Sequence, residues 1–370
     1  MISRRKAIGL LTAGIMTPAV TRSLNLHQTS KPLKLHTVRA EIQRHFDTLQ
    51  IPNREYGAYF TGPDRQTDLY ASCDIAIARH IMGENLKKSL SKAQRQQWSG
   101  YINSFQSPED GSYSERYHHT QLHANGMTIG ALSVLGERQK YQVKLYDAFD
   151  TPDKVVPWLE QINWAKQWGA SHLFWGGVHC YSLSSGCTQN WLNTVFDWLN
   201  KNLDKDTGWW RAGTVYADRH QPLGGSVHIL PIYQHHHRQF PYPEKVIDSV
   251  LALQLPNGRW LNREKDRTQV MHYLELDALY AFKYMMELAP GYRTGDIYDA
   301  LHRYARLVLQ YWNDPDHAWK NLHPHRILSI VGTFGLLQNL LPKQFVDDRT
   351  WTDIFSDIRL YHAKAVEAKS

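Results

Sequence analysis

One structural unit recurs along the chain and constrains the fold more than any other feature of the sequence. Each copy contains an amphipathic helix ending near a polar amide, a Gly-x-aromatic turn, an irregular tail and a more apolar helix. The first copy contains YGAYF, the second DGSY, the fourth DTGWW and the fifth PNGRW. The third is degenerate, with KVVPWLEQINWAKQW as its outer helix and SHLFWGGVHCYSLSS as its inner helix, and a sixth contains DPDHAW. A repeat of this kind predicts helical hairpins that pack on their neighbours.

Local signals support helices in these positions. Ser91 and Gln94 form a capping box, and Pro152 and Pro243 stand at first helical turns. The second helix of each copy is apolar nearly all round, so it should be buried, whereas the first carries one apolar stripe. Glycine permits the tight reversal between them, and the aromatic residue fills the wedge between neighbouring hairpins.

A hairpin with one buried and one half-buried helix cannot cover itself, so successive hairpins must stack, and six can close into a ring. We therefore predict an all-α fold, a closed (α/α)6 toroid of six helical hairpins over residues 36–342. An open helical solenoid built from the same hairpins is the alternative. Residues 343–370 are expected to form a C-terminal helix and tail.

The repeats also resemble those of known families. LQLPNGRW, FQSPEDGSY and LDKDTGWW resemble the Q-x-x-D-G-x-W repeats of the terpenoid cyclase and protein prenyltransferase α/α toroids, the prenyltransferase/squalene oxidase repeat superfamily. DKDTGWW followed by GGSVHIL resembles the unsaturated glucuronyl hydrolases, which are six-hairpin barrels. Both resemblances imply a toroid, but a shared fold does not decide the activity. The chain lacks the D-x-D-D motif of the squalene-hopene type cyclases and the Asp, Cys and His set of the prenyltransferase zinc site.

The N-terminus, MISRRKAIGLLTAGIMTPAV, resembles a bacterial twin-arginine export signal, and an ordinary basic arm is the alternative. Residues 1–30 are therefore expected to be signal and linker, with the twin-arginine machinery as a partner and a periplasmic or secreted location. Loss of residues 1–20 removes three cations and lowers the formal net charge from +7 to +4. A mildly basic chain permits an anionic substrate but does not favour nucleic acid. A mean hydropathy of -0.51 argues against an integral membrane domain.

The three cysteines leave one question open. An oxidising compartment would allow Cys180 and Cys187 to form a disulfide, leaving Cys73 free. Three buried thiols are an equally good interpretation of the same spacing.

In a toroid of hairpins, the N-termini of the inner helices and the tails before them meet at one rim. Eleven of the 20 histidines fall in these tails or in the first turns that follow: His118, His119, His123, His172, His179, His220, His228, His272, His317, His323 and His325. Acidic, cationic and thiol side chains accompany them: Asp68, Asp74, Glu115, Asp218, Glu275, Asp277, Arg211, Arg219, Arg326, Cys73 and Cys180. Because several hairpins contribute, we expect a functional site at this rim. Hydrogen-bonded structural histidines are the alternative.

Within this set, position relative to the turn aromatic selects candidates. Asp277 lies 17 residues after Trp260, His228 lies 18 after Trp210, and Asp74 lies 15 after Tyr59, so the three should sit at similar depth. The candidate catalytic residues are His228, Asp277, Asp74, His123 and Asp218. The candidate substrate-binding residues are Arg211, Trp209, Trp210, Tyr113, Tyr59, His179, Trp260 and His272.

A metal is a minority interpretation at this stage. The sequence HTQLH places His119 and His123 one helical turn apart, a spacing that can chelate a metal. Thr120, however, stands where a zinc peptidase of the H-E-x-x-H type carries glutamate. We therefore predict no metal and no cofactor, with a His-bound divalent metal as the alternative.

Three functions compete. The first is an exported lyase or hydrolase of acidic saccharides, with His228 or His123 as the base of a lyase and Arg211 as the neutraliser of the substrate carboxylate. In a hydrolase, Asp74, Asp218 or Asp277 would serve as acid and base. The second is an isoprenoid enzyme of the cyclase or prenyltransferase kind. The third is a non-catalytic toroid that binds a glycan or a protein. The expected partner is a small molecule or oligosaccharide.

Overall fold

Helices make up most of the structure, a computed structural model that describes residues 31–114, 119–261 and 270–369. This confirms the all-α prediction. The expected export signal lies outside the described residues, as do Glu115 and His118. The unit that begins at Pro32 contains all of the elements discussed below.

The outer and inner helices alternate along the chain. The outer helices are α1 (Leu35–Leu49), α4 (Lys92–Asn103), α6 (Pro152–Glu160), α9 (Gln189–Asn202), α12 (Pro243–Leu253) and α14 (Thr294–Asn313). The inner helices are α2 (Leu69–Ile81), α5 (Gln121–Leu135), α7 (Gln167–Leu173) with η3 (Phe174–His179) and α8 (Cys180–Ser182), α10 (Gln221–Ser226) with α11 (Leu230–His235), α13 (Tyr273–Leu288) and α15 (Pro324–Leu340). Shorter elements are α3 (Leu86–Ser89), η1 (Lys144–Ala148), η2 (Trp164–Lys166) and η5 (Trp319–Asn321).

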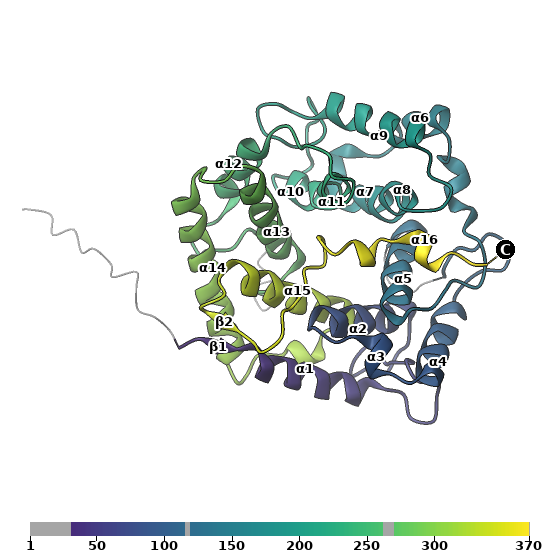
Figure 1. Ribbon diagram of the computed structural model, residues 1–370. Helices are drawn as coiled ribbons and strands as arrows, with labels where there is room; N and C mark the ends of the chain where they lie inside the picture. Colours follow the sequence, from purple (N-terminus) through teal and green to yellow (C-terminus); the bar gives the residue numbers. More distant parts are fainter. Residues whose placement is uncertain (1–30, 115–118, 262–269, 370) are drawn as a thin grey trace, which may run out of the picture. The chain divides into compact units, whose positions relative to one another are not determined.

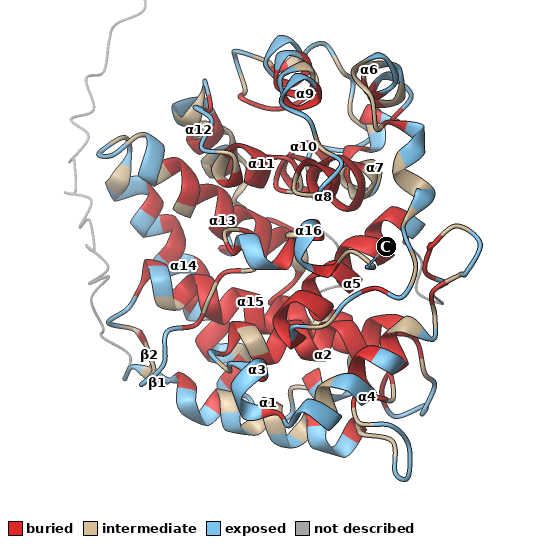
Figure 2. Ribbon diagram, turned by 45° about the vertical axis from the view of Figure 1, so that its right-hand side comes forward, coloured by how far each residue is buried: buried red, intermediate tan, exposed pale blue. Residues whose placement is uncertain are grey.

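Burial differs between the two sets in the way the sequence predicts. The inner helices are buried along most of their length, whereas the outer helices alternate between buried and exposed residues (Figure 2). Each inner segment contacts the next: α2 with α5, α5 with η3, α7 with α10, α10 with α13, and α13 with α15. Helix α15 also packs on α2, although the two lie at opposite ends of the described chain (Figure 1).

The Gly-x-aromatic turns of the first, second and fifth copies share one hydrogen-bonding scheme, whereas the fourth copy has Leu203 at the position of the amide. The side-chain amides of Gln50, Gln106 and Gln254 donate to backbone carbonyls of the following turns, at 3.1, 3.0 and 3.0 Å. The turn glycine is left-handed in the copies described, with φ of 70° at Gly111 and 91° at Gly258, a conformation that strains other residues. The polar amide of the repeat therefore holds the reversal between outer and inner helix.

The third and fourth hairpins depart from the simple pattern of one outer and one inner helix, since their inner segments are divided into α7, η3 and α8 and into α10 and α11. Pro157 lies inside α6 and removes a backbone donor, and α6 ends at Glu160. The next inner segment begins at Gln167, so the end of the predicted third outer helix belongs to the connection and to α7. In the fourth hairpin, Pro231 stands in the first turn of α11, which separates α11 from α10.

The C-terminal segment, residues 343–369, differs from the expected closing helix. It begins with β2 (Phe345–Val346), which pairs in parallel with β1 (Leu33–Lys34), and later contains only the short helices η6 (Ile358–Leu360) and α16 (Ala363–Val366). Its backbone bonds to groups at the C-terminal ends of inner helices, as where Thr352 N–H donates to the Ile81 carbonyl at 2.9 Å. Figure 1 shows this segment, in yellow, passing among the inner helices. Extended chain suits this position because those helix ends supply its hydrogen-bond partners.

The structure also bears on the state of the cysteines and on membrane-spanning helices. Cys73, Cys180 and Cys187 are free thiols. Within the described ranges, every helix is too short or too polar to cross a bilayer.

Candidate metal centre and its pocket

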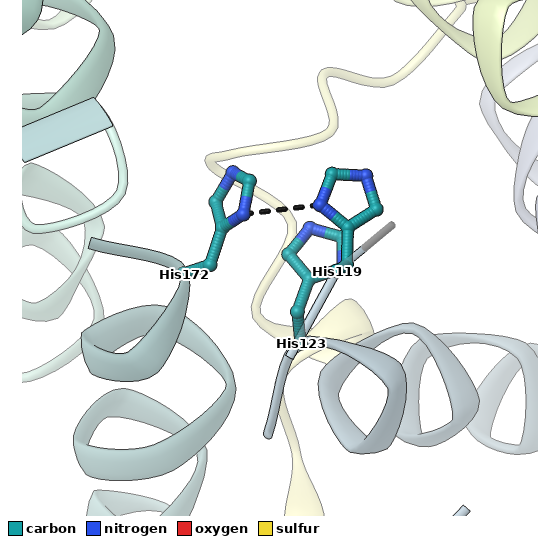
Figure 3. Close-up of side chains that lie close together, drawn as sticks. All are labelled: His119, His123 and His172. Atoms are coloured by element: carbon teal, nitrogen blue, oxygen red, sulfur yellow. Dashed lines mark hydrogen bonds between the residues drawn. The ribbon is translucent and has the colours of Figure 1, made fainter. Parts of the chain in front are cut away.

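Three histidines from two neighbouring hairpins meet at the start of the inner helices. His119 immediately precedes the N-cap of α5, His123 lies in the first turn of α5, and His172 comes from α7 (Figure 3). One ring nitrogen from each lies within 4.8 Å of the others. Nδ1 of His119 and Nδ1 of His172 are 3.1 Å apart, and the rings of His119 and His123 stack with centroids 4.2 Å apart. Nitrogen atoms of three imidazoles are therefore clustered closely enough to be considered as ligands of one ion.

Local capping sets the position of His119 and His123. Thr120 is the N-cap of α5, and its hydroxyl accepts a hydrogen bond from the backbone N–H of His123 at 3.1 Å. His119 therefore lies just outside the helix and His123 in its first turn, which brings their rings face to face. Thr120 has a structural reason to occupy the second position of HTQLH, because threonine is a favoured capping residue.

Close packing of α5 against η3 brings His172 to the pair. A Cβ on Gly176 would lie 1.8 Å from the Leu122 carbonyl oxygen, and one on Gly126 would lie 2.5 Å from the Trp175 ring. Only glycine allows the two backbones to approach this closely. Gly126 and Gly176, which are distant in sequence, thus determine how closely His172 approaches His119 and His123.

The arrangement fits a divalent metal such as zinc. Two nitrogens bound to a tetrahedral ion at about 2.0–2.1 Å lie about 3.3 Å apart, close to the 3.1 Å between His119 and His172. Nδ1 of His123 is 2.5 Å from the Tyr70 hydroxyl, which leaves Nε2 as its nitrogen for a ligand bond. A hydrogen bond on the second ring nitrogen is what orients most metal-binding histidines. Three protein ligands with a further position for substrate are typical of catalytic zinc.

Burial keeps the imidazoles of His123, His172 and His228 neutral. It lowers the pKa of His123 and of His172 well below the ordinary value, with neighbouring imidazoles adding to the effect, and it lowers the pKa of His228 to about 3. Neutral imidazole is the form that binds a metal. A cluster of neutral, electron-pair-donating rings is therefore available to a cation.

His228 and His325 flank the three histidines. The His228 ring lies 4.9 Å from that of His172, and the His325 ring lies 5.1 Å from that of His119. The Ser171 hydroxyl lies 2.8 Å from the Trp168 carbonyl and 2.9 Å from Nδ1 of His228. His228 is therefore hydrogen-bonded to α7 beside His172.

The second flanking histidine contacts a buried carboxyl group. Nδ1 of His325 is 3.2 Å from both carboxylate oxygens of Asp74. Burial raises the pKa of Asp74 well above its ordinary value and lowers the pKa of His325 to about 3. The pair is therefore a hydrogen-bonded acid and neutral imidazole rather than an ion pair. Next to it, Nε2 of His323 lies 2.8 Å from Asp68.

A pocket of about 610 Å³ opens beside His172. Its lining comes from α7 with the residues before it, and from the start of α10: Asn163, Lys166, Trp168, Gly169, Ala170, His172, Ala217, Asp218 and Gln221. The volume lies within the range of about 300–1,000 Å³ common to small-ligand sites. A smaller pocket of 420 Å³ beside Arg238 and α9 contains none of these histidines.

The candidate catalytic residues are partly brought together. His123, His228 and Asp74 belong to the cluster, and Asp218 lines the pocket. Asp277 is buried on α13, where burial and, second, Glu275 raise its pKa well above the ordinary value. Its Oδ2 has no hydrogen-bond partner among the described residues.

The candidate substrate-binding residues lie mostly elsewhere. Tyr59, Tyr113, Trp209, Trp210 and Trp260 are buried, and the indoles of Trp210 and Trp260 donate to carbonyls of outer helices at 2.9 Å.

The three remaining candidates each have partners of their own. Arg211 pairs with Glu160, its guanidinium 2.5 Å from the carboxylate, and bonds to Asn202. His272 caps α13 and contacts Arg326. His179 lies in η3, stacks on Tyr361 of the C-terminal segment and bonds to His235 at 3.0 Å.

Sequence reasoning placed His119, His172 and His325 at the rim but did not select them as site residues. The available signal was the HTQLH spacing, which identifies two ligands. His172 could not be found in this way because it is brought in by packing. No protein-family model, curated protein or solved structure matches the chain.

Proposed function

We propose that the chain is a divalent-metal-dependent enzyme, and that it is the lyase or hydrolase of acidic saccharides expected from the sequence. The observation that carries the proposal is the convergence of His119, His123 and His172 beside a pocket. A bound ion would supply Lewis-acid polarisation of a substrate oxygen.

The proposal includes the closed (α/α)6 toroid. Its support is the order of contacts among inner helices, which runs from α2 through α5, α7, α10, α13 and α15 and returns to α2. In such a toroid the beginnings of the inner helices share one mouth, which is where the histidines lie. The C-terminal segment covers the other ends of these helices, so substrate would enter from the histidine side.

The protein groups around the ion would position and exchange protons with the substrate. His228, whose pKa burial lowers to about 3, offers a neutral imidazole next to His172. The Asp74–His325 pair offers one shared proton next to His119. These two groups flank the metal ligands, as an acid and a base must flank a reacting centre.

A metal-dependent enzyme of acidic saccharides is favoured over a non-catalytic binding toroid and over an isoprenoid enzyme. A purely binding toroid predicts no cluster of strongly shifted pKa values, yet Asp74, His123, His172, His228 and His325 form one. An isoprenoid enzyme needs an aromatic and aliphatic chamber, whereas this mouth is lined by imidazoles and carboxyl groups.

The test combines metal content with activity. Full-length protein is stripped with chelator, reloaded with Zn²⁺, Mn²⁺ or Co²⁺, and assayed on a panel of uronate polymers for unsaturated product and new reducing ends. We expect about one tightly bound ion per chain, loss of that ion in His119→Ala and His172→Ala, and retention in the control His302→Ala, which changes an exposed histidine of α14. Wild-type protein that retains no ion, or metal-loaded protein that acts on no member of the panel, would refute the proposal.

A further inference from the structure

The pocket beside His172 carries an inference about what it binds. The pocket is continuous with a candidate metal ligand, so a molecule held there would reach the ion. Its walls combine one large aromatic ring, one lysine and hydrogen-bonding side chains.

Trp168 forms a fixed aromatic wall. Helix α10 packs directly against it, because a Cβ on Gly224 would lie 2.5 Å from Cγ of the indole. Its backbone N–H donates to the Gln221 side chain at 3.0 Å, which joins the two helices at the pocket. The indole is only half-buried, so part of it faces the pocket. A flat, rigid, half-exposed aromatic surface suits the apolar face of a ring-shaped ligand.

The two charged groups of the pocket are not equally available. Asp218 accepts hydrogen bonds from the backbone N–H of His220 and from the Gln221 side chain, both at 2.9 Å. These bonds turn its carboxylate toward the first turn of α10. Lys166 is exposed, and within the described ranges no carboxylate lies at ion-pair distance from it. The pocket therefore offers a cation whose charge is not already matched.

We propose that this pocket binds an acidic saccharide, with Trp168 stacked on the face of a sugar ring and Lys166 paired with its carboxylate. The inference rests on the proposed function and adds the subsite and the group that recognises the acid. The sequence-based choice for carboxylate recognition, Arg211, is already paired with Glu160, whereas Lys166 lines the pocket that touches His172. Asn163 and Gln221 can bond to sugar hydroxyls from the same walls.

The test measures binding, separately from turnover. Full-length, metal-loaded protein is titrated by calorimetry with trimers of galacturonate, mannuronate, guluronate and glucuronate, each beside its carboxyl-reduced, neutral counterpart. At least one acidic trimer should bind about tenfold more tightly than its neutral counterpart, equivalent to about 1.4 kcal/mol. Lys166→Ala should abolish this preference and Lys166→Arg should keep it. The control Lys201→Ala, on the outer helix α9, should leave it unchanged.

Trp168→Ala should weaken binding of acidic and neutral trimers alike, and Trp168→Phe should recover part of the loss. The inference is overturned if no acidic trimer binds, if acidic and neutral trimers bind equally, or if Lys166→Ala retains the preference. Metal content, measured on the same samples, separates the two proposals. Lys166-dependent binding by protein that holds no ion would refute the metal-dependent enzyme and leave the subsite standing. Metal-dependent turnover of a uronate polymer by protein whose acid preference survives Lys166→Ala would overturn the subsite and leave the enzyme standing.

Discussion

Substitution of Gly176 tests the link between close helix packing and the histidine cluster. An alanine Cβ at this position would lie 1.8 Å from the Leu122 carbonyl oxygen, whereas real Cβ contacts essentially never fall under 3.0 Å. The backbones of α5 and η3 would have to separate by about 1.2 Å, because a carbonyl of a helix cannot swing aside as a side chain can. Overpacking of this kind costs about 1–3 kcal/mol.

The same displacement moves His123 away from His172, since each lies within one or two turns of the contact. Gly176→Ala should therefore lower the free energy of unfolding by about 1–3 kcal/mol in a urea titration and also weaken zinc affinity measured with a competing chelator. The matched control is Gly295→Ala in α14, where an added Cβ meets nothing within 4 Å. Control protein should be as stable as wild type or up to about 1 kcal/mol more stable, because alanine favours helix. A Gly176→Ala protein with wild-type stability and wild-type zinc affinity would refute the reasoning.

Three further predictions concern two side chains that position His123 and one buried carboxyl group on α13. Thr120→Ala removes the N-cap of α5 and should cost about 1 kcal/mol in thermal or urea unfolding, with weaker zinc binding because His123 loses its anchored backbone. Tyr70→Phe removes the hydroxyl next to Nδ1 of His123 and should weaken zinc affinity by about 10–100-fold in chelator competition, while the fold measured by circular dichroism is retained. Asp277 has a raised pKa in the folded state, so the folded chain holds a proton that the unfolded chain releases above about pH 4, and stability falls as pH rises through this window. Asp277→Asn should reduce this slope by up to about 1.4 kcal/mol per pH unit, and an unchanged pH profile of urea midpoints would contradict the assignment.

The elements that the sequence predicts well are those set by local interactions. The Gly-x-aromatic turn carries its own glycine conformation and its own amide hydrogen bond, as at Gln106 and Gly111, so each hairpin can be recognised without its neighbours. The third hairpin was harder to place because Pro157 shortens α6 and a π-helix interrupts the inner segment at Phe174–His179.

The site was predicted only in part because its geometry depends on packing between hairpins. His119 and His123 share a turn and are visible as a pair, but His172 reaches them through the contacts of Gly126 and Gly176 with another helix. The aromatic residues of the Gly-x-aromatic turns were predicted to bind substrate, but they lie in the core. A tryptophan beside a predicted rim resembles a sugar platform, yet the Trp210 indole donates to the Leu199 carbonyl under the outer helix. The half-exposed Trp168, which belongs to none of the Gly-x-aromatic turns, is the tryptophan that lines the pocket.

The C-terminal segment shows a further limit of sequence patterns. Its conformation is set by the helix ends that it covers, including the Ile81 carbonyl that accepts from Thr352. Periodicity carries no information about such partners, because they come from distant parts of the chain.

The most direct test of the metal centre is anomalous diffraction at the zinc edge from crystals of the zinc-loaded full-length protein. We predict one strong anomalous peak with nitrogen atoms of His119, His123 and His172 at about 2.0–2.1 Å. Zinc-loaded crystals in which these three rings are well ordered but enclose no anomalous peak would contradict the account.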